Sequence, residues 1–252
     1  MKKSIYIVVL LVIAALGAQS QSKQALIDTA NSAYKNSNYD RAIKYYDSIV
    51  NQGYVSAELF YNLGNAYFKK QKLAEAILFY EKALKYDPGN GDIRHNLEMA
   101  RQMTIDKIEK VPEMFYVKWW QNIYNLFSSN SWAKIVVGFF TLTLIMAGFF
   151  ILSRRVVLRK FAFYTGLLTL LITIFSFTIA AKKYHDFTHD KAGIVFDPSV
   201  TVKGSPSQNS VDLFVIHEGT KVFIQDKLGE WYEIKIANGS VGWIKKDTIE
   251  VI

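Results

Sequence analysis

The sequence predicts a multidomain membrane protein: an all-α helical-repeat domain, two transmembrane helices and a C-terminal all-β barrel. Three observations predict this fold class. Residues 23–90 repeat with a period of 34, two long uncharged apolar runs follow, and in residues 192–252 the hydrophobic period changes to two. The hydrophobic fraction of 50% and the mean hydropathy of +0.08 agree with part of the chain lying in lipid.

Residues 1–20 are typical of a secretory signal peptide. Lys2 and Lys3 precede an apolar run, and the small residues Ala18 and Ser20 are suitably placed for cleavage before Gln21. The apolar run is too short to cross a bilayer comfortably. We therefore expect residues 1–20 to direct export, with an uncleaved anchor as the alternative.

Residues 21–110 are expected to form the repeat domain, with repeats at about 23–56 and 57–90 and a capping helix at 91–110. Small residues recur 34 positions apart, as do aromatic residues, because two packed helices need small side chains where they cross and large ones beside the crossing. The second copy resembles the tetratricopeptide repeat, through Leu63, Gly64, Tyr67, Ala76, Tyr80, Ala83 and Pro88.

Residues 111–132 are expected to form an aromatic helix at the bilayer interface. Its aromatic residues recur on one side of a helix and carry few charges between them: Phe115, Tyr116, Trp119, Trp120, Tyr124 and Phe127. Amphipathic rings of this kind favour the boundary between lipid and water. The alternative is an ordinary helix that packs on the repeats.

The apolar runs at 135–152 and 161–181 are each long enough to cross the hydrocarbon of a bilayer. The loop between them, residues 153–160, carries Arg154, Arg155, Arg159 and Lys160. The positive-inside rule assigns such a loop to the cytoplasm, which leaves both flanking domains in the periplasm. We therefore expect a multi-pass protein of the inner (cytoplasmic) membrane, with a linker at 182–191.

Residues 192–252 are expected to form the barrel, from short strands of alternating hydrophobicity divided by turn residues. The order and spacing of several segments resemble bacterial SH3-like domains: Val200 to Lys203, Glu218-Gly219-Thr220, Trp231-Tyr232, and Gly239 to Ile244. This resemblance implies a small module that binds a ligand or a partner.

The charge distribution and composition exclude several functions. The net charge is +8, but residues 111–189 carry most of the excess, with 8 basic and 2 acidic residues, so no nucleic-acid-binding face is expected. Without cysteine, thiol catalysis is excluded. We find no set of polar residues suited to catalysis, no cofactor motif and no metal site, although His185 and His189 leave a metal interpretation open as an alternative.

Two groups of side chains are candidates for binding. In the repeats, the first helix of each hairpin lines a concave groove, and its candidates are Asn31, Tyr34, Asn62, Asn65, Phe68 and Asn96. In the barrel, the aromatic candidates are Phe196, Trp231, Tyr232 and Trp243. The alternatives are solvated helix surface for the first group and barrel core for the second, above all for Trp231 and Trp243.

The whole arrangement resembles the BatE proteins of the Bacteroides aerotolerance operon. That resemblance implies association with other Bat-type membrane proteins and a role in envelope maintenance or oxidative-stress tolerance. The resulting hypothesis is a non-catalytic scaffold of the bacterial envelope that binds protein partners through both modules. The alternative is a peptidoglycan-binding anchor that recruits a cell-wall enzyme through its repeats.

Overall fold

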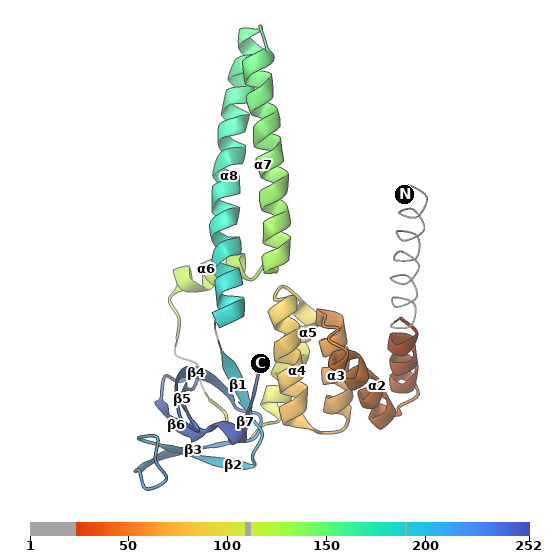
Figure 1. Ribbon diagram of the computed structural model, residues 1–252, viewed down its shortest axis with the longest axis vertical. Helices are drawn as coiled ribbons and strands as arrows, with labels where there is room; N and C mark the ends of the chain where they lie inside the picture. The colour runs from red at the N-terminus through yellow and green to blue at the C-terminus, as the bar shows by residue number, and fades with distance from the viewer. Residues whose placement is uncertain (1–23, 109–111, 190) are drawn as a thin grey trace, which may run out of the picture.

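The computed structural model describes residues 24–108, 112–189 and 191–252 (Figure 1). The expected signal peptide, the last two residues of the expected capping helix and the first residue of the expected aromatic helix lie outside the described residues. Within them the predicted fold class is confirmed, with a helical-repeat region first, two long apolar helices next and an antiparallel sheet last.

The repeat region consists of helical residues 24–35 and four further helices: α2 (Tyr39–Asn51), α3 (Ala57–Lys69), α4 (Leu73–Tyr86) and α5 (Gly91–Gln102). Three of these begin at a side-chain cap. Asn38 accepts from the backbone N–H of Arg41 before α2, Ser56 from that of Leu59 before α3, and Asn90 from those of Asp92 and Ile93 before α5. Each cap satisfies backbone donors that the first helical turn leaves unpaired.

Gly64 explains why the period of 34 keeps a small residue where α3 crosses α4. A Cβ atom at this glycine would lie 2.7 Å from Cδ1 of Tyr80, whose side chain is fully buried. The corresponding residue of the first repeat, Ala30, is also fully buried. The close approach of the two helices therefore depends on the residue size that the sequence repeats.

The two long helices, α7 (Ser129–Leu152) and α8 (Val156–His189), form a hairpin that projects away from the rest of the molecule (Figure 1). Both are long and apolar enough to cross a membrane, with mean hydropathies of 2.6 and 1.9 over their most apolar windows. Thr143 and Thr169 join them by a hydroxyl–hydroxyl bond of 2.9 Å. Helix α6 (Phe115–Tyr124) lies across the base of this hairpin.

The helices extend beyond the apolar runs that marked them in the sequence. Of the expected loop 153–160, only residues 153–155 lie between helices, and Arg159 and Lys160 belong to α8. Residues 182–189 of the expected linker are helical as well. Similarly, α5 and α6 are shorter than the expected ranges 91–110 and 111–132. The hydrophobicity of the sequence marks only the portion of each helix that is suited to lipid. The helix itself continues until its backbone hydrogen bonds end.

The C-terminal sheet has seven antiparallel strands in the order β3-β2-β6-β5-β4-β1-β7. The strands are β1 (Ala192–Val195), β2 (Ser199–Lys203), β3 (Asp212–His217), β4 (Lys221–Leu228), β5 (Trp231–Lys235), β6 (Val241–Lys245) and β7 (Ile249–Val251), with a short 3₁₀ helix η1 (Lys246–Thr248) before β7. Inward-facing residues build its core, among them Val202, Ile216, Val222, Ile234 and Ile244.

The sheet packs directly on the repeats rather than standing apart from them. Ile194 of β1 is fully buried in the same apolar cluster as Ile77 and Tyr80 of α4, and Phe196 and Ile252 pack on that cluster. Conversely, Ile108, from the segment after α5, packs on the core of the sheet. Figure 1 shows β1 and β7 on the side of the sheet that faces α4. The two modules therefore share a continuous apolar contact.

Candidate interaction surfaces and the domain junction

Three of the six candidate residues of the repeats form hydrogen bonds between helices. The side-chain oxygen of Asn31 accepts from the hydroxyl of Tyr46 at 2.6 Å, and that of Asn65 accepts from the hydroxyl of Tyr80 at 2.7 Å. The amide of Asn96 donates to the side-chain oxygen of Asn65 at 2.8 Å and to the hydroxyl of Tyr61 at 3.0 Å. The Asn–Tyr bond recurs 34 residues apart, so these asparagines tie the repeats together.

Tyr34, Asn62 and Phe68 complete the candidate set. The ring of Tyr34 meets that of Tyr39 edge to face, 5.4 Å between centroids, and Phe68 packs half-buried on the core of the second repeat. Asn62 is half-buried and has no side-chain hydrogen bond among the residues that the structure describes. Its amide therefore keeps both donor and acceptor capacity for a ligand, and binding through this surface remains a prediction.

We expect Asn65→Ala and Asn62→Ala to behave differently. Asn65→Ala leaves the buried Tyr80 hydroxyl and the Asn96 amide without their shared partner, which should cost about 1–2 kcal/mol of stability. Asn62→Ala should stay within about 0.5 kcal/mol because no such bond is lost. Hydrogen exchange of the α3 and α4 amides in the full-length protein measures both. Equal protection in the two variants would contradict the structural role of Asn65.

The four aromatic candidates of the barrel do not form one site. Trp231 lines a surface pocket of about 340 Å³ together with Asp197, Ser199, Val200, Thr201, Lys203, Gln208, Lys245 and Thr248. Tyr232 packs on the barrel core, and Phe196 packs on the repeat cluster instead. Trp243 is half-buried and pairs across strands with Glu233 and Lys203. Of the four, Trp231 is the residue that lines this pocket, whose other walls are mostly polar.

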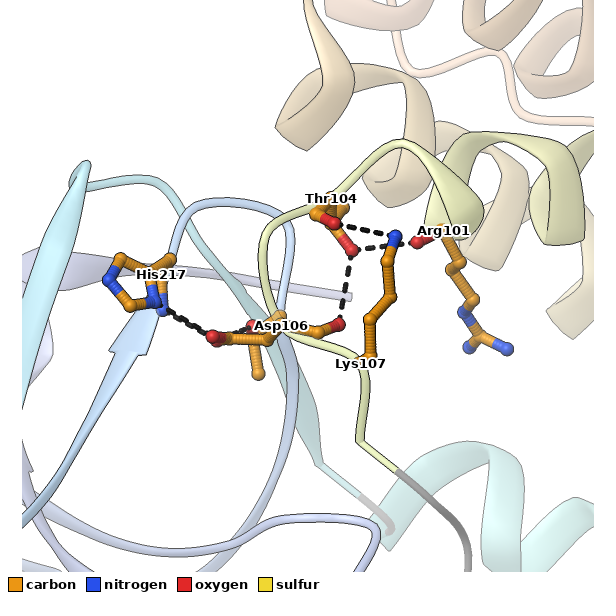
Figure 2. Close-up of polar contacts among 6 residues, drawn as sticks. Arg101, Thr104, Asp106, Lys107 and His217 are labelled. Atoms are coloured by element: carbon orange, nitrogen blue, oxygen red, sulfur yellow. Dashed lines mark hydrogen bonds and ion pairs between the residues drawn. The ribbon is translucent and has the colours of Figure 1, made fainter.

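Asp106 joins the segment after α5 to the barrel. One carboxylate oxygen accepts from the backbone N–H of His217 at 2.7 Å and from the hydroxyl of Thr220 at 2.6 Å, and the other lies 2.7 Å from Nδ1 of His217 (Figure 2). Because an ionised carboxylate only accepts, Nδ1 carries the proton. Burial raises the pKa of Asp106, but the bonds from Thr220 and His217 outweigh it and hold that pKa below its ordinary value.

Glu81 of α4 forms the second polar link of the junction. Its side chain is 7% exposed and pairs with Arg101 of α5 and, at 2.7 Å, with Lys221 of β4. Burial raises the pKa of Glu81, but the two cations outweigh it and leave the pKa lowered. A buried carboxylate needs such partners to remain charged. The Glu81 carboxylate of α4 therefore holds both α5, through Arg101, and β4, through Lys221.

Gly219 allows the turn between β3 and β4 to approach the repeats. Its φ of +84° is in the left-handed region that favours glycine. A Cβ atom there would lie 2.6 Å from Cγ2 of Thr104 and 3.2 Å from Cδ1 of Ile77. A larger residue would therefore strain the turn and separate the modules.

This junction was not predicted from the sequence. One feature of the sequence could have indicated Glu81: its carboxylate stands among the apolar residues Ile77, Leu78 and Tyr80 of one helix. A carboxylate buried there would require a partner. No such feature indicated Asp106, because its partners lie 111 and 114 residues away in the chain.

The lowered pKa values predict acid sensitivity of the junction. Glu81 and Asp106 ordinarily titrate at 4.5 and 3.8. Their contribution to stability is therefore fully present above those values and is lost as the pH falls through the lower folded-state pKa values. We expect the melting temperature of the full-length protein to fall between about pH 5 and pH 3. The double variant Glu81→Gln/Asp106→Asn should fall less over that range, and parallel curves would contradict the prediction.

At the base of the hairpin, α8 is held to the end of α6. The buried ammonium of Lys183 donates to the backbone carbonyl of Tyr124 at 2.8 Å and to the side chain of Asn125 at 3.2 Å. The hydroxyl of Tyr124 in turn donates to Asp186. His185 and His189 stack on each other, 4.2 Å between ring centroids, and no group of three or more metal-ligating side chains gathers anywhere in the described ranges.

Comparisons with known proteins identify both modules. Residues 27–91 match the family model of the tetratricopeptide repeat, and residues 198–250 match that of the bacterial SH3 domain. No curated protein matches the chain. Among solved structures, an NlpC/P60 family protein from Bacillus cereus ATCC 10987 is 18% identical, with a TM-score of 0.21. The match covers 28% of this chain and 23% of that one, and it carries no argument about function.

The two matched models describe modules that typically bind other molecules rather than catalyse reactions, and no catalytic family model is matched. The chain thus carries a tetratricopeptide region and a bacterial SH3 domain on either side of two apolar helices in the sequence. Together the two modules suggest protein–protein interaction or peptidoglycan binding.

Proposed function

We propose that this protein is a non-catalytic, membrane-anchored adaptor of the bacterial envelope that presents two binding modules as one rigid unit. The single observation that carries the proposal is the junction, in which Glu81 pairs with Arg101 and Lys221 while Asp106 binds His217 and Thr220. These contacts favour one relative orientation of the two modules, because a shift that kept Glu81 buried would leave this carboxylate without a cation.

In this proposal, α7 and α8 cross the inner membrane, with Arg154, Arg155, Arg159 and Lys160 on the cytoplasmic side and both modules in the periplasm. The concentration of cations at the tip of the hairpin supports this orientation. Helix α6 lies in the interface on the periplasmic side. Phe115 and Trp119 are 85% and 65% exposed, and the ring of Trp120 meets that of Phe175 of α8 edge to face. These rings suit the boundary of lipid and water.

The partners in this proposal are proteins, which bind to the repeats around the half-buried side chains of Asn62 and Phe68. Other Bat-type membrane proteins are the proposed partners, because the order of modules resembles that of BatE proteins. The hairpin supports pairing within the membrane, since its outer faces expose apolar side chains such as Phe140, Leu144 and Phe177.

Co-purification from solubilised membranes tests the adaptor. Full-length protein carrying a C-terminal tag should retain specific membrane proteins, and Asn62→Ala should lose them while its melting temperature stays near that of the original protein. Exposed Tyr54 of the loop before α3 provides the control, as Tyr54→Ala should leave retention unchanged. Retention of no membrane protein by the original chain would overturn the proposal.

The second candidate function is a peptidoglycan-binding anchor, favoured by the pocket around Trp231. An aromatic ring beside Asp197, Lys203 and Lys245 suits a ligand that carries both sugar and charged peptide groups. Sedimentation of the detergent-solubilised chain with purified peptidoglycan tests it. Binding that Trp231→Ala abolishes and Tyr232→Phe preserves would favour this function over the first, and no sedimentation above a protein control would exclude it.

A further inference from the structure

The tip of the apolar hairpin carries a basic pocket that neither binding module uses. This pocket, of about 240 Å³, is lined by Phe150 of α7 and by Val156, Arg159, Lys160, Phe163 and Tyr164 of α8. The guanidinium carbon of Arg159 lies 5.1 Å from the ring centroid of Phe150, and the rings of Phe150 and Phe163 lie 6.0 Å apart. Two cations and three aromatic rings thus surround one depression.

The positive charge at this tip has no acidic residue near it along α7 or α8, where Asp186 lies at the opposite end of α8. The sequence contains no Asp or Glu from Met114 to His185. None of the ion pairs in the described part of the chain involves Arg154, Arg155, Arg159 or Lys160. Four cations within seven residues repel one another, and an anion held between them would relieve that repulsion.

The pocket lies at the end of the apolar stretch of α8. Residues 161–181 begin directly after Lys160 and, at 1.5 Å per residue, extend over about 32 Å, close to the hydrocarbon thickness of a bilayer of about 30 Å. Lys182 and Lys183 follow at the other end. When this stretch fills the hydrocarbon, Arg159 and Lys160 lie at the level of the lipid headgroups of the leaflet farther from the two modules.

We propose that this pocket binds the headgroup phosphate of an anionic phospholipid, an inference that rests on the membrane insertion proposed above. Arg159 and Lys160 pair with the phosphate oxygens, and the hydroxyl of Tyr164 supplies a further donor. Phe150 and Phe163 contact the glycerol and the first methylene groups of the chains. The apolar rings beside the cations favour a lipid over free phosphate, because a phosphate ion offers them nothing to contact.

Native mass spectrometry of the full-length protein in mild detergent tests the site. Phosphatidylglycerol should bind more tightly than phosphatidylcholine, and Arg159→Gln/Lys160→Gln should weaken phosphatidylglycerol binding at least about tenfold, since a hydrogen bond to a charged group contributes about tenfold. Arg154→Gln/Arg155→Gln is the matched control. It removes the same charge from the same tip but from residues outside the pocket, and it should change binding no more than about twofold, because exposed charges that do not contact the phosphate are screened by solvent and salt.

Three results would overturn the proposal. Equal weakening in the two double variants would mean that only net charge matters, and equal binding of phosphatidylcholine would mean that the headgroup charge is not recognised. Displacement of the lipid by millimolar inorganic phosphate would identify a free-phosphate site instead. Failure of the proposed membrane insertion can be distinguished from failure of the lipid site. If α7 and α8 did not cross a membrane, alkaline carbonate would extract the protein from membranes, and this is measured without adding lipid.

Discussion

Replacing Glu81 with alanine should open the junction between the two modules. The substitution leaves Arg101 and Lys221, which are 28% and 25% exposed, facing each other without the carboxylate that both bind. Removing one partner of a buried ion pair costs about 3–5 kcal/mol, and the partial exposure of the two cations puts the expected loss at the lower end, about 3 kcal/mol. In hydrogen exchange of the full-length protein, the β1 amides should exchange about a hundredfold faster.

Glu75 provides the control for this prediction. It lies on the same helix, α4, and pairs with Lys72 at 3.2 Å, but that pair is on the surface. Glu75→Ala should therefore change exchange at β1 by less than about twofold, because surface ion pairs contribute little. The prediction would be wrong if Glu81→Ala left the protection of β1 at its original level.

Gly219→Ala should separate the modules by a different physical route. The methyl group meets Thr104 and Ile77 at 2.6 and 3.2 Å, and the residue must also keep a φ of +84°. A left-handed non-glycine residue costs about 1–2 kcal/mol, and overpacking a buried contact costs a further 1–3 kcal/mol or so. We expect a total loss of about 3 kcal/mol and much faster cleavage by trypsin after Lys107, which follows Asp106.

Gly239 allows the two costs of that substitution to be measured separately. Its φ is +95°, but a Cβ atom there would meet nothing within 4 Å. Gly239→Ala should therefore lower the melting temperature of the barrel through backbone strain alone and leave the rate of cleavage after Lys107 unchanged. If both variants accelerated cleavage equally, steric contact at the junction would not be the cause.

The repeats, the hairpin and the barrel could be predicted because each produces a local pattern in the sequence. A period of 34 with a small residue at Ala30 and Gly64 reflects a contact between neighbouring helices, and two uncharged runs reflect helices suited to lipid. Alternation reflects strands with one buried face. None of these patterns requires knowledge of residues far away in the chain.

The junction and the details of the candidate surfaces could not be predicted in this way. Glu81 and Lys221 are 140 residues apart, and no local pattern reports that they meet. Phe196 and Trp231 look alike as aromatic residues of short segments, yet one packs on the repeats and the other lines a pocket. The hydrogen bond between Asn65 and Tyr80 could have been predicted, since Asn31 and Tyr46 occupy the same two positions 34 residues earlier.

The direct passage from α8 to the barrel has a mechanical consequence. Helix α8 ends at His189 and β1 begins at Ala192, while Lys183 and Asp186 bind the end of α6. The short connection therefore leaves the barrel little freedom to move relative to the hairpin. The contacts of the junction restrict the repeats in the same way. A change in the tilt of the hairpin would therefore move the sheet and the repeats together, as one body.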